Sequence, residues 1–402
     1  MVLQLDMVQT IALAVLVLIL GQVIRKKIDF LTRFCIPAPV IGGLIFAILA
    51  LIFKQTNILE FQMDATLQKL LMTAFFTTVG FTASLKLLKK GGLQVFIFLI
   101  LAVALVTLQN IVGVSLAKVF NLNALIGLST GSVPMTGGHG TSGAFAPLFE
   151  QSGAVGATTV AMAAATFGLI TGSMLGGPIA KKLIEKHNLL DRSKKDSSLN
   201  MSKESTTAET NTFSKLIPEN FSLAAIQIIL AMGLGTILSS LLEKTGMTFP
   251  PYIGAMFAAA IMRNISDVTN SYKIAEEEIN ILGNISLSLF LSMALMGLQL
   301  WQLADLAVPM LIMLIAQTVL MAAFAYFVTF NVMGRDYQAA VLAGGHCGFG
   351  MGATPNAIAN MEAISSNYGP APAAFFIIPL VGSLFIDFFN AGIITTFMNF
   401  FG

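Results

Sequence analysis

The chain has 402 residues, of which 56% are hydrophobic and only 10% are charged, whereas a soluble domain has about 25% charged residues. This composition excludes an ordinary soluble domain, and a formal net charge of +2 gives no support for nucleic-acid binding. The sequence therefore predicts an all-α, polytopic membrane protein that lies in a lipid bilayer.

Apolar runs long enough to cross a bilayer follow one another along the chain. In the first half they lie near residues 8–24, 37–53, 70–85, 93–118 and 156–180, and in the second half near 220–242, 250–264, 280–300, 308–331 and 371–398. The polar residues 191–217 separate the halves and have the composition of a disordered linker. We therefore expect an N-terminal unit, 1–190, and a C-terminal unit, 218–402.

The basic residues predict an orientation. Arg25, Lys26 and Lys27 follow the first apolar run instead of preceding it, which argues against a cleaved signal peptide. When the N-terminus is placed outside, all but four of the 22 Lys and Arg residues fall on the cytoplasmic side. The positive-inside rule thus predicts that both termini lie outside the cell and that the linker is cytoplasmic.

Two glycine-rich hydrophobic segments follow the fourth and the ninth apolar runs. The first spans Thr130 to Pro147 and the second spans Ala343 to Asn360. Each glycine weakens a helix by about 1 kcal/mol relative to alanine, and irregular backbone survives at membrane depth only where protein or a water-filled cavity satisfies it. Such a pair indicates the substrate and ion site of a secondary transporter, so we expect re-entrant hairpins at about 128–148 and 342–365.

The two halves also carry an internal repeat. With the second half shifted back by about 213 residues, several residues coincide, namely Pro39 with Pro251, Gly131 with Gly344, Gly137 with Gly350, Thr141 with Thr354 and Gly168 with Gly382. Five crossings per half is an odd number, so the halves have opposite orientations, as in an inverted-topology repeat. In that arrangement the hairpins enter from opposite sides and their tips meet near the midplane. Chance matching in a glycine-rich chain is the alternative.

The hairpins can hold an anion and a cation without basic side chains. The N-termini of short helices present free N–H groups that bind carboxylates, whereas unwound backbone carbonyls coordinate Na⁺. Glycines let a ligand approach the backbone, although close helix packing is an alternative reason for them. The candidate substrate- and ion-binding residues are Ser132, Gly137, Gly138, His139, Gly140, Thr141, Gly344, Gly345, His346, Gly348, Gly350, Gly352, Thr354, Asn356, Asp387 and Asn390.

Three ionisable side chains belong to this set. His139 and His346 either bind substrate or relay protons, or hold the hairpins together as neutral, hydrogen-bonded groups. Asp387 is a carboxylate deep in the last apolar run, where charge is expensive. It is a candidate partner of Na⁺ or of a substrate ammonium, with Asn390 one turn away; burial as a protonated acid is the alternative. No basic residue is predicted inside an apolar run, so Na⁺ would have to offset the charge of an anionic substrate.

Long runs of this sequence resemble the bacterial sodium/glutamate symporter family. They are IPAPVIGG from Ile36, LSLFLSMALMGLQLW up to Trp301, GGHGT from Gly137, GHCGFGMGATPNAIANM from Gly345 and FIDFFNAG from Phe385. The resemblance covers nearly the whole chain and is weakest in the central linker.

The resemblance implies electrogenic, Na⁺-coupled uptake of L-glutamate across the bacterial inner membrane, with no organic cofactor. It also implies a fold similar to that of sodium–citrate carriers, in which a transport domain bearing both hairpins moves against a scaffold domain in an elevator-like stroke, usually in a homodimer. Residues Gly137–Thr141 and Gly344–Asn356 would then be the paired hairpin tips.

Other functions remain in competition. A Na⁺-coupled citrate or malate symporter suits backbone anion sites equally well, because no residue by itself specifies glutamate. A channel or a cation/proton antiporter is less favoured, since Asp387 has no acidic neighbour in any apolar run. An enzyme is not expected: an H-E-x-x-H motif is absent, and a hydrolase built on Ser142 and His139 would not need the second glycine-rich segment.

Overall fold

In a computed structural model of the chain, the structure describes residues 2–189, 218–244, 250–303 and 306–402. Within these residues, nine helices are long and apolar enough to cross a membrane. This confirms the expectation of a predominantly helical, multi-pass membrane protein. The predicted linker, 191–217, lies outside the described residues.

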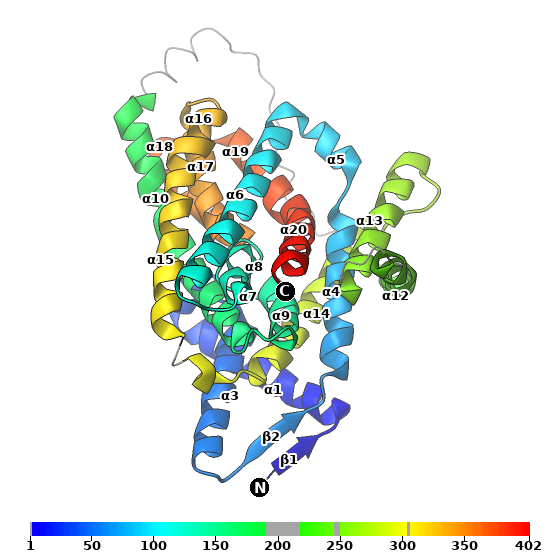
Figure 1. The fold of residues 1–402 in the computed structure, drawn as a ribbon. Helices are drawn as coiled ribbons and strands as arrows, with labels where there is room; N and C mark the ends of the chain where they lie inside the picture. Colours follow the sequence, from blue (N-terminus) through cyan, green and yellow to red (C-terminus); the bar gives the residue numbers. More distant parts are fainter. Residues whose placement is uncertain (1, 190–217, 245–249, 304–305) are drawn as a thin grey trace.

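The described residues form the following helical elements (Figure 1). In chain order they are α1 (Met7–Lys27), α2 (Asp29–Arg33), α3 (Ala38–Gln55), α4 (Thr66–Thr82), α5 (Leu85–Lys90), α6 (Gly92–Val119), α7 (Ala124–Leu128), α8 (Ser132–Met135), α9 (Gly138–Gln151), α10 (Ala157–His187), α12 (Pro218–Glu243), α13 (Pro251–Thr269), α14 (Glu276–Met296), η1 (Leu300–Leu303), α15 (Ala307–Ala323), η2 (Phe324–Thr329), α16 (Phe330–Val332), α17 (Tyr337–Gly350), α18 (Thr354–Tyr368), α19 (Pro372–Pro379), η3 (Leu380–Phe385) and α20 (Ile386–Phe401).

Helix α13 differs from the sequence expectation of an apolar run at 250–264. It forms a helix of 19 residues, but it is not among the nine apolar spans found in the described part of the chain. The reason is its polar second half. There the Arg263 guanidinium contacts the carboxylate of Asp267 at 3.2 Å and that of Glu276 at 2.8 Å.

The first span shows how local sequence sets helix ends. The Asp6 carboxylate accepts a hydrogen bond from the Gln9 backbone N–H at 2.8 Å, and the Gln9 side chain accepts one from the Asp6 N–H at 3.1 Å. This capping box satisfies N–H groups that a helix start leaves free. The last turn of α1 carries Arg25, Lys26 and Lys27, whose positive charges are favourable near the negative end of the helix dipole.

Both glycine-rich segments fold as pairs of short helices with a break between them. In the first, α8 ends at Met135 and α9 begins at Gly138, whose φ of +62° favours glycine. In the second, α17 ends at Gly350 and α18 begins at Thr354, followed by Pro355 in the first turn, a position where proline is tolerated. With 14 residues in α9 and 15 in α18, neither reaches the roughly 20 residues that a bilayer requires.

The helices pack into two bundles. Bundle 1 consists of α1, α3, α4, α12, α13 and α14, and bundle 2 consists of α6 to α10, α15 and α17 to α20, because most helix contacts fall within these two sets. Figure 1 shows α4, α12 and α13 on one side and α10, α15 and α17 on the other. Each half of the chain supplies its first helices to bundle 1 and its later helices to bundle 2.

Bundle 2 has a dense interior. Its largest apolar core includes fully buried Phe98, Leu183 and Ile378 from three different helices. Helix α10 contacts both helix pairs, α8–α9 and α17–α18. It approaches them very closely, since a methyl group added at Gly168 would lie 2.2 Å from the Met351 carbonyl oxygen.

The structure contains a pair of β-strands that was not predicted from the sequence. Strand β1 (Val2–Leu5) pairs in parallel with β2 (Glu60–Met63), which precedes α4. The Lys54 ammonium contacts the Glu60 carboxylate at 2.9 Å and lies 4.1 Å from the Trp301 ring centroid. The strand pair fixes the start of the chain to the α3–α4 connection, far from the two helix breaks (Figure 1).

Candidate functional site

A cavity of about 810 Å³ lies between the two bundles. Bundle 1 contributes side chains of α1, α3, α4 and α14 to its wall, and bundle 2 contributes both helix breaks together with η3 and the start of α20. Of the predicted site residues, the structure brings seven to this wall: Gly137, Gly138, His139, Gly140, Gly352, Thr354 and Asp387.

The two breaks meet directly, as the sequence analysis expected. The Thr136 hydroxyl oxygen lies 3.4 Å from the Gly350 carbonyl oxygen, and a methyl group added at Gly138 would lie 3.3 Å from the Gly352 carbonyl oxygen. Gln109 of α6 joins both breaks, because its side-chain oxygen accepts a 2.9 Å hydrogen bond from Thr136 and its side-chain nitrogen donates one of 2.6 Å to Gly350.

Two helix N-termini face the same cavity. Gly138, His139 and Gly140 are the first residues of α9, and Thr354 is the first residue of α18. The first N–H groups of a helix have no acceptor within the helix, and they carry the positive end of its dipole. The start of α9 therefore offers several backbone donors, whereas the start of α18 offers the Thr354 N–H, because Pro355 has no N–H and the Asn356 N–H bonds to the Ala353 carbonyl.

His139 is held in place by a hydrogen bond. Its Nε2 lies 3.0 Å from the Thr166 hydroxyl, which donates its own hydrogen to the Met162 carbonyl at 3.1 Å. Since that hydroxyl has one hydrogen, the His139 Nε2–H is the donor to Thr166. The ring thereby fixes the start of α9 against α10.

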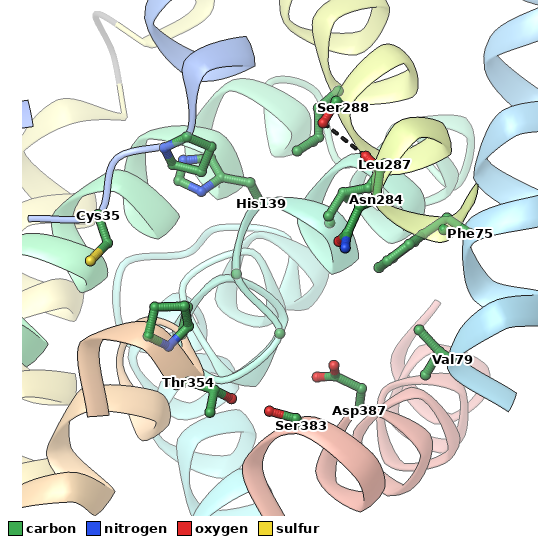
Figure 2. Close-up of a pocket in the computed structure, with 18 of the residues that line it drawn as sticks. Cys35, Phe75, Val79, His139, Asn284, Leu287, Ser288, Thr354, Ser383 and Asp387 are labelled. Carbon is green, nitrogen blue, oxygen red and sulfur yellow. Dashed lines mark hydrogen bonds between the residues drawn. The ribbon is translucent and has the colours of Figure 1, made fainter. Parts of the chain in front are cut away.

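Oxygen atoms gather around the start of α20. Figure 2 shows the side chains of Thr354, Ser383 and Asp387 directed toward one another on one wall of the cavity. The Thr354 hydroxyl donates a 2.8 Å hydrogen bond to the Gly382 carbonyl. Ser383 was not among the predicted site residues, although it lies only four residues before Asp387, in the π-helical turn η3.

The other predicted site residues do not line this cavity. Ser132 and Asn390 instead contact each other, because the Ser132 hydroxyl donates a 2.7 Å hydrogen bond to the Asn390 side-chain oxygen. Asn390 therefore points into bundle 2 and does not join Asp387. Residues Thr141, Gly344, Gly345, His346, Gly348, Gly350 and Asn356 are also buried within bundle 2.

Several of these buried residues form contacts inside bundle 2 that stabilise the helices on either side of the breaks. His346 Nδ1 lies 2.9 Å from the Thr329 hydroxyl, among the rings of Phe98 and Phe349. The Asn356 side-chain nitrogen donates a 2.8 Å hydrogen bond to the Leu169 carbonyl in α10. A methyl group on Gly348 would lie 2.4 Å from the Ala357 Cα, so the glycine allows α17 and α18 to pack closely.

The structure also places a basic side chain on the cavity wall, which corrects the expectation that no basic residue lies inside a span. Arg25 belongs to the span Met7–Lys27 and lines the cavity together with Gln22 and Cys35. The signal was present in the sequence, since Arg25 follows the first apolar run directly. Other wall residues that the sequence analysis missed are Thr78, Thr82, Asn280, Asn284 and Ser288.

In the described residues, no group of three or more His, Cys, Asp or Glu side chains is arranged to hold a metal ion. Both cysteines are free, Cys347 within bundle 2 and Cys35 on the cavity wall.

A multi-pass helical protein with interrupted helices meeting at a central polar cavity belongs to the class of membrane transport proteins. Comparison with known sequences gives the particular family. The sodium/glutamate symporter family matches residues 3–370, and the chain belongs to this family.

Two named relatives are similar in sequence over nearly the whole chain. A protein named sodium/glutamate symporter from Escherichia coli (strain K12) is 42% identical over 395 residues, which cover 98% of each chain. The protein of the same name from Haemophilus influenzae is 40% identical over 389 residues, which cover 96% of this chain and 95% of the relative. The family resemblance is therefore confirmed, and a carrier rather than an enzyme is the correct class.

Proposed function

We propose that the protein is a secondary transporter that carries L-glutamate into the cell together with Na⁺. The single observation that carries this proposal is the meeting of two interrupted helix pairs at one polar cavity, in a chain of the sodium/glutamate symporter family. The relatives that match the chain from end to end carry the same name.

The cavity chemistry supports a dicarboxylate amino acid. Glutamate has two carboxylates, and two helix N-termini face the cavity: α9 presents the N–H groups of its first turn, and α18 presents the Thr354 N–H. The proposed contact residues are Gly138, His139, Gly140 and Thr354, with Gly137 and Gly352 letting the ligand approach the backbone.

We propose that the helix pairs are re-entrant hairpins that enter from opposite sides of the membrane, within two inverted repeats. Two observations support this. The breaks, at residues 136–137 and 351–353, lie near equivalent places in the two halves, and each half divides its helices between the bundles in the same order. Bundle 1 would then be the scaffold and bundle 2 the moving, elevator-like domain. The protein would form a homodimer.

We propose the inner membrane as the location, with both termini outside and the linker 191–217 in the cytoplasm. The bundle 1 part of the cavity wall is formed by the end of α1 that carries Arg25 and by the start of α14, close after Lys273. By the positive-inside rule these basic ends are cytoplasmic. The cavity would thus open to the cytoplasm, in the state that releases substrate.

Uptake into proteoliposomes tests the proposal. Purified protein in sealed liposomes, with an imposed inward Na⁺ gradient and a negative interior potential, is expected to accumulate radiolabelled L-glutamate. Unlabelled citrate and malate, the substrates of the alternative carriers, are expected to compete poorly. Uptake that persists unchanged when external Na⁺ is replaced by choline, or that citrate blocks as well as glutamate does, would reject the proposed function.

A further inference from the structure

Asp387 is a carboxylate without a partner at membrane depth. It lies in the first turn of α20 on the cavity wall, and it forms no hydrogen bond or ion pair with any residue in the described parts of the chain. The basic side chain on the wall, Arg25, belongs to the opposite bundle and does not pair with it. An unpaired charge of this kind is unfavourable, so the site favours either a proton or a cation that comes from solution.

Two hydroxyl oxygens lie beside this carboxylate. Ser383 precedes Asp387 by one helical turn and is exposed to the cavity, and its hydroxyl has no hydrogen-bond partner among the described residues. Thr354 faces both from the start of α18, as Figure 2 shows. Its hydroxyl hydrogen goes to the Gly382 carbonyl, which leaves its lone pairs available.

The backbone supplies a fourth oxygen because η3 is a π-helical turn. The N–H of Ile386 bonds to the Val381 carbonyl, so the Gly382 carbonyl does not receive the bond that an α-helix would give it. The Thr354 hydroxyl occupies one lone pair of this carbonyl, and a second lone pair remains. Single π turns inside α-helices are frequent at functional sites.

We infer that Asp387, Ser383, Thr354 and the Gly382 carbonyl together bind one coupling Na⁺ ion. One carboxylate and three neutral oxygens suit a hard cation of low charge. The inference rests on the proposed function and gives its cation a location. Because Thr354 also begins α18, the ion would lie between Asp387 and a substrate carboxylate, so that each ligand lowers the electrostatic cost of binding the other.

Thermal unfolding of the purified protein in detergent, without glutamate, tests this site. The melting temperature is measured against Na⁺ concentration, with choline keeping the ionic strength constant, because a ligand that binds the folded state raises it in a saturable way. For Asp387→Asn, Ser383→Ala and Thr354→Val, we expect the half-saturating Na⁺ concentration to rise by about 10- to 100-fold. Thr354→Ser keeps the hydroxyl and is expected to stay near wild type.

Thr396→Val is the matched control. Thr396 lies on the same helix, α20, and its hydroxyl donates a 2.9 Å hydrogen bond to the Gly392 carbonyl, away from the cavity wall. Its removal is expected to leave the half-saturating Na⁺ concentration unchanged. Should Asp387→Asn fail to fold, the Ser383 and Thr354 variants still decide the question.

Two outcomes would overturn the inference. In the first, the wild-type protein shows no rise in melting temperature with Na⁺ beyond that with choline. In the second, Asp387→Asn and Ser383→Ala keep the wild-type response to Na⁺ but lose glutamate affinity at saturating Na⁺, which would assign the carboxylate to the substrate ammonium. Failure of the proposed function is recognised separately, as absence of Na⁺-driven glutamate uptake by wild-type proteoliposomes.

Discussion

The Gln109 side-chain nitrogen donates a 2.6 Å hydrogen bond to the backbone carbonyl of Gly350, the last residue of α17. The same side chain accepts a hydrogen bond from Thr136, in the other break. One fully buried amide thus holds both helix breaks together. It satisfies backbone and hydroxyl groups that would otherwise be unpaired inside bundle 2.

Replacing Gln109 is expected to loosen both breaks. Gln109→Leu removes the partner of both the Gly350 carbonyl and the Thr136 hydroxyl and leaves only the 3.4 Å contact between them, at a cost of about 1–3 kcal/mol. We expect a lower melting temperature and a weaker affinity for glutamate in binding titrations. Gln94→Leu, at an exposed site on the same helix, is the control. Wild-type affinity in the Gln109 variant would show that the amide does not organise the site.

The close approach of α10 to α17 predicts a contrast between two glycines of α10. Gly168→Ala would place a methyl group 2.2 Å from the Met351 carbonyl oxygen, and such overpacking costs about 1–3 kcal/mol. Gly177→Ala meets no atom within 4 Å and is expected to stabilise α10 by up to about 1 kcal/mol. The denaturation midpoint of each variant is compared with that of the wild-type protein. Equal shifts of the midpoint in both variants would contradict the close packing of α10 at Gly168.

Arg25 predicts an electrostatic contribution to substrate binding. Arg25 lines the cavity that we assign to an anionic solute, and charge attraction of this type weakens with salt. Arg25→Gln is expected to raise the KM for glutamate about threefold to tenfold at low ionic strength, and less at high ionic strength. Lys26→Gln, at the exposed neighbouring position, is expected to have little effect. An unchanged KM in Arg25→Gln would exclude this role.

The Cys35 thiol offers a measurement of the cavity environment. Burial raises the pKa of Cys35 above its ordinary value, and the neighbouring Arg25 charge partly opposes this rise. Only the thiolate reacts readily, so the maleimide labelling rate is expected to rise with pH about a midpoint above that of a free thiol. Arg25→Gln should move the midpoint higher still. Buried Cys347 is replaced by Ser in this experiment, and a midpoint at or below the free-thiol value would contradict the prediction.

The parts of the fold that depend on local sequence could be predicted. The membrane spans follow from the length of apolar runs, and the two breaks follow from clusters of glycine that include Gly138 and Gly352. The strand pair could not be predicted, because four residues near the N-terminus and the short segment Glu60–Met63 form it only by pairing across the chain.

The candidate site was predictable only in part, for a physical reason. The sequence indicates which segments are interrupted, but the direction of each side chain depends on the packing of bundle 2. Asn390 lies on the same helix as Asp387, yet its amide contacts Ser132 inside the bundle. Ser383 and Arg25 belong to the cavity because of the π turn before α20 and because of how the bundles face each other, and neither property is local.

A high-resolution structure of the protein in lipid nanodiscs, with saturating Na⁺ and L-glutamate, tests the central claim most directly. We predict glutamate in the cavity between the bundles, with its carboxylates at the N-termini of α9 and α18, next to Gly138, Gly140 and Thr354. Glutamate bound elsewhere, or bound while the two helix breaks lie apart from each other, would contradict the account.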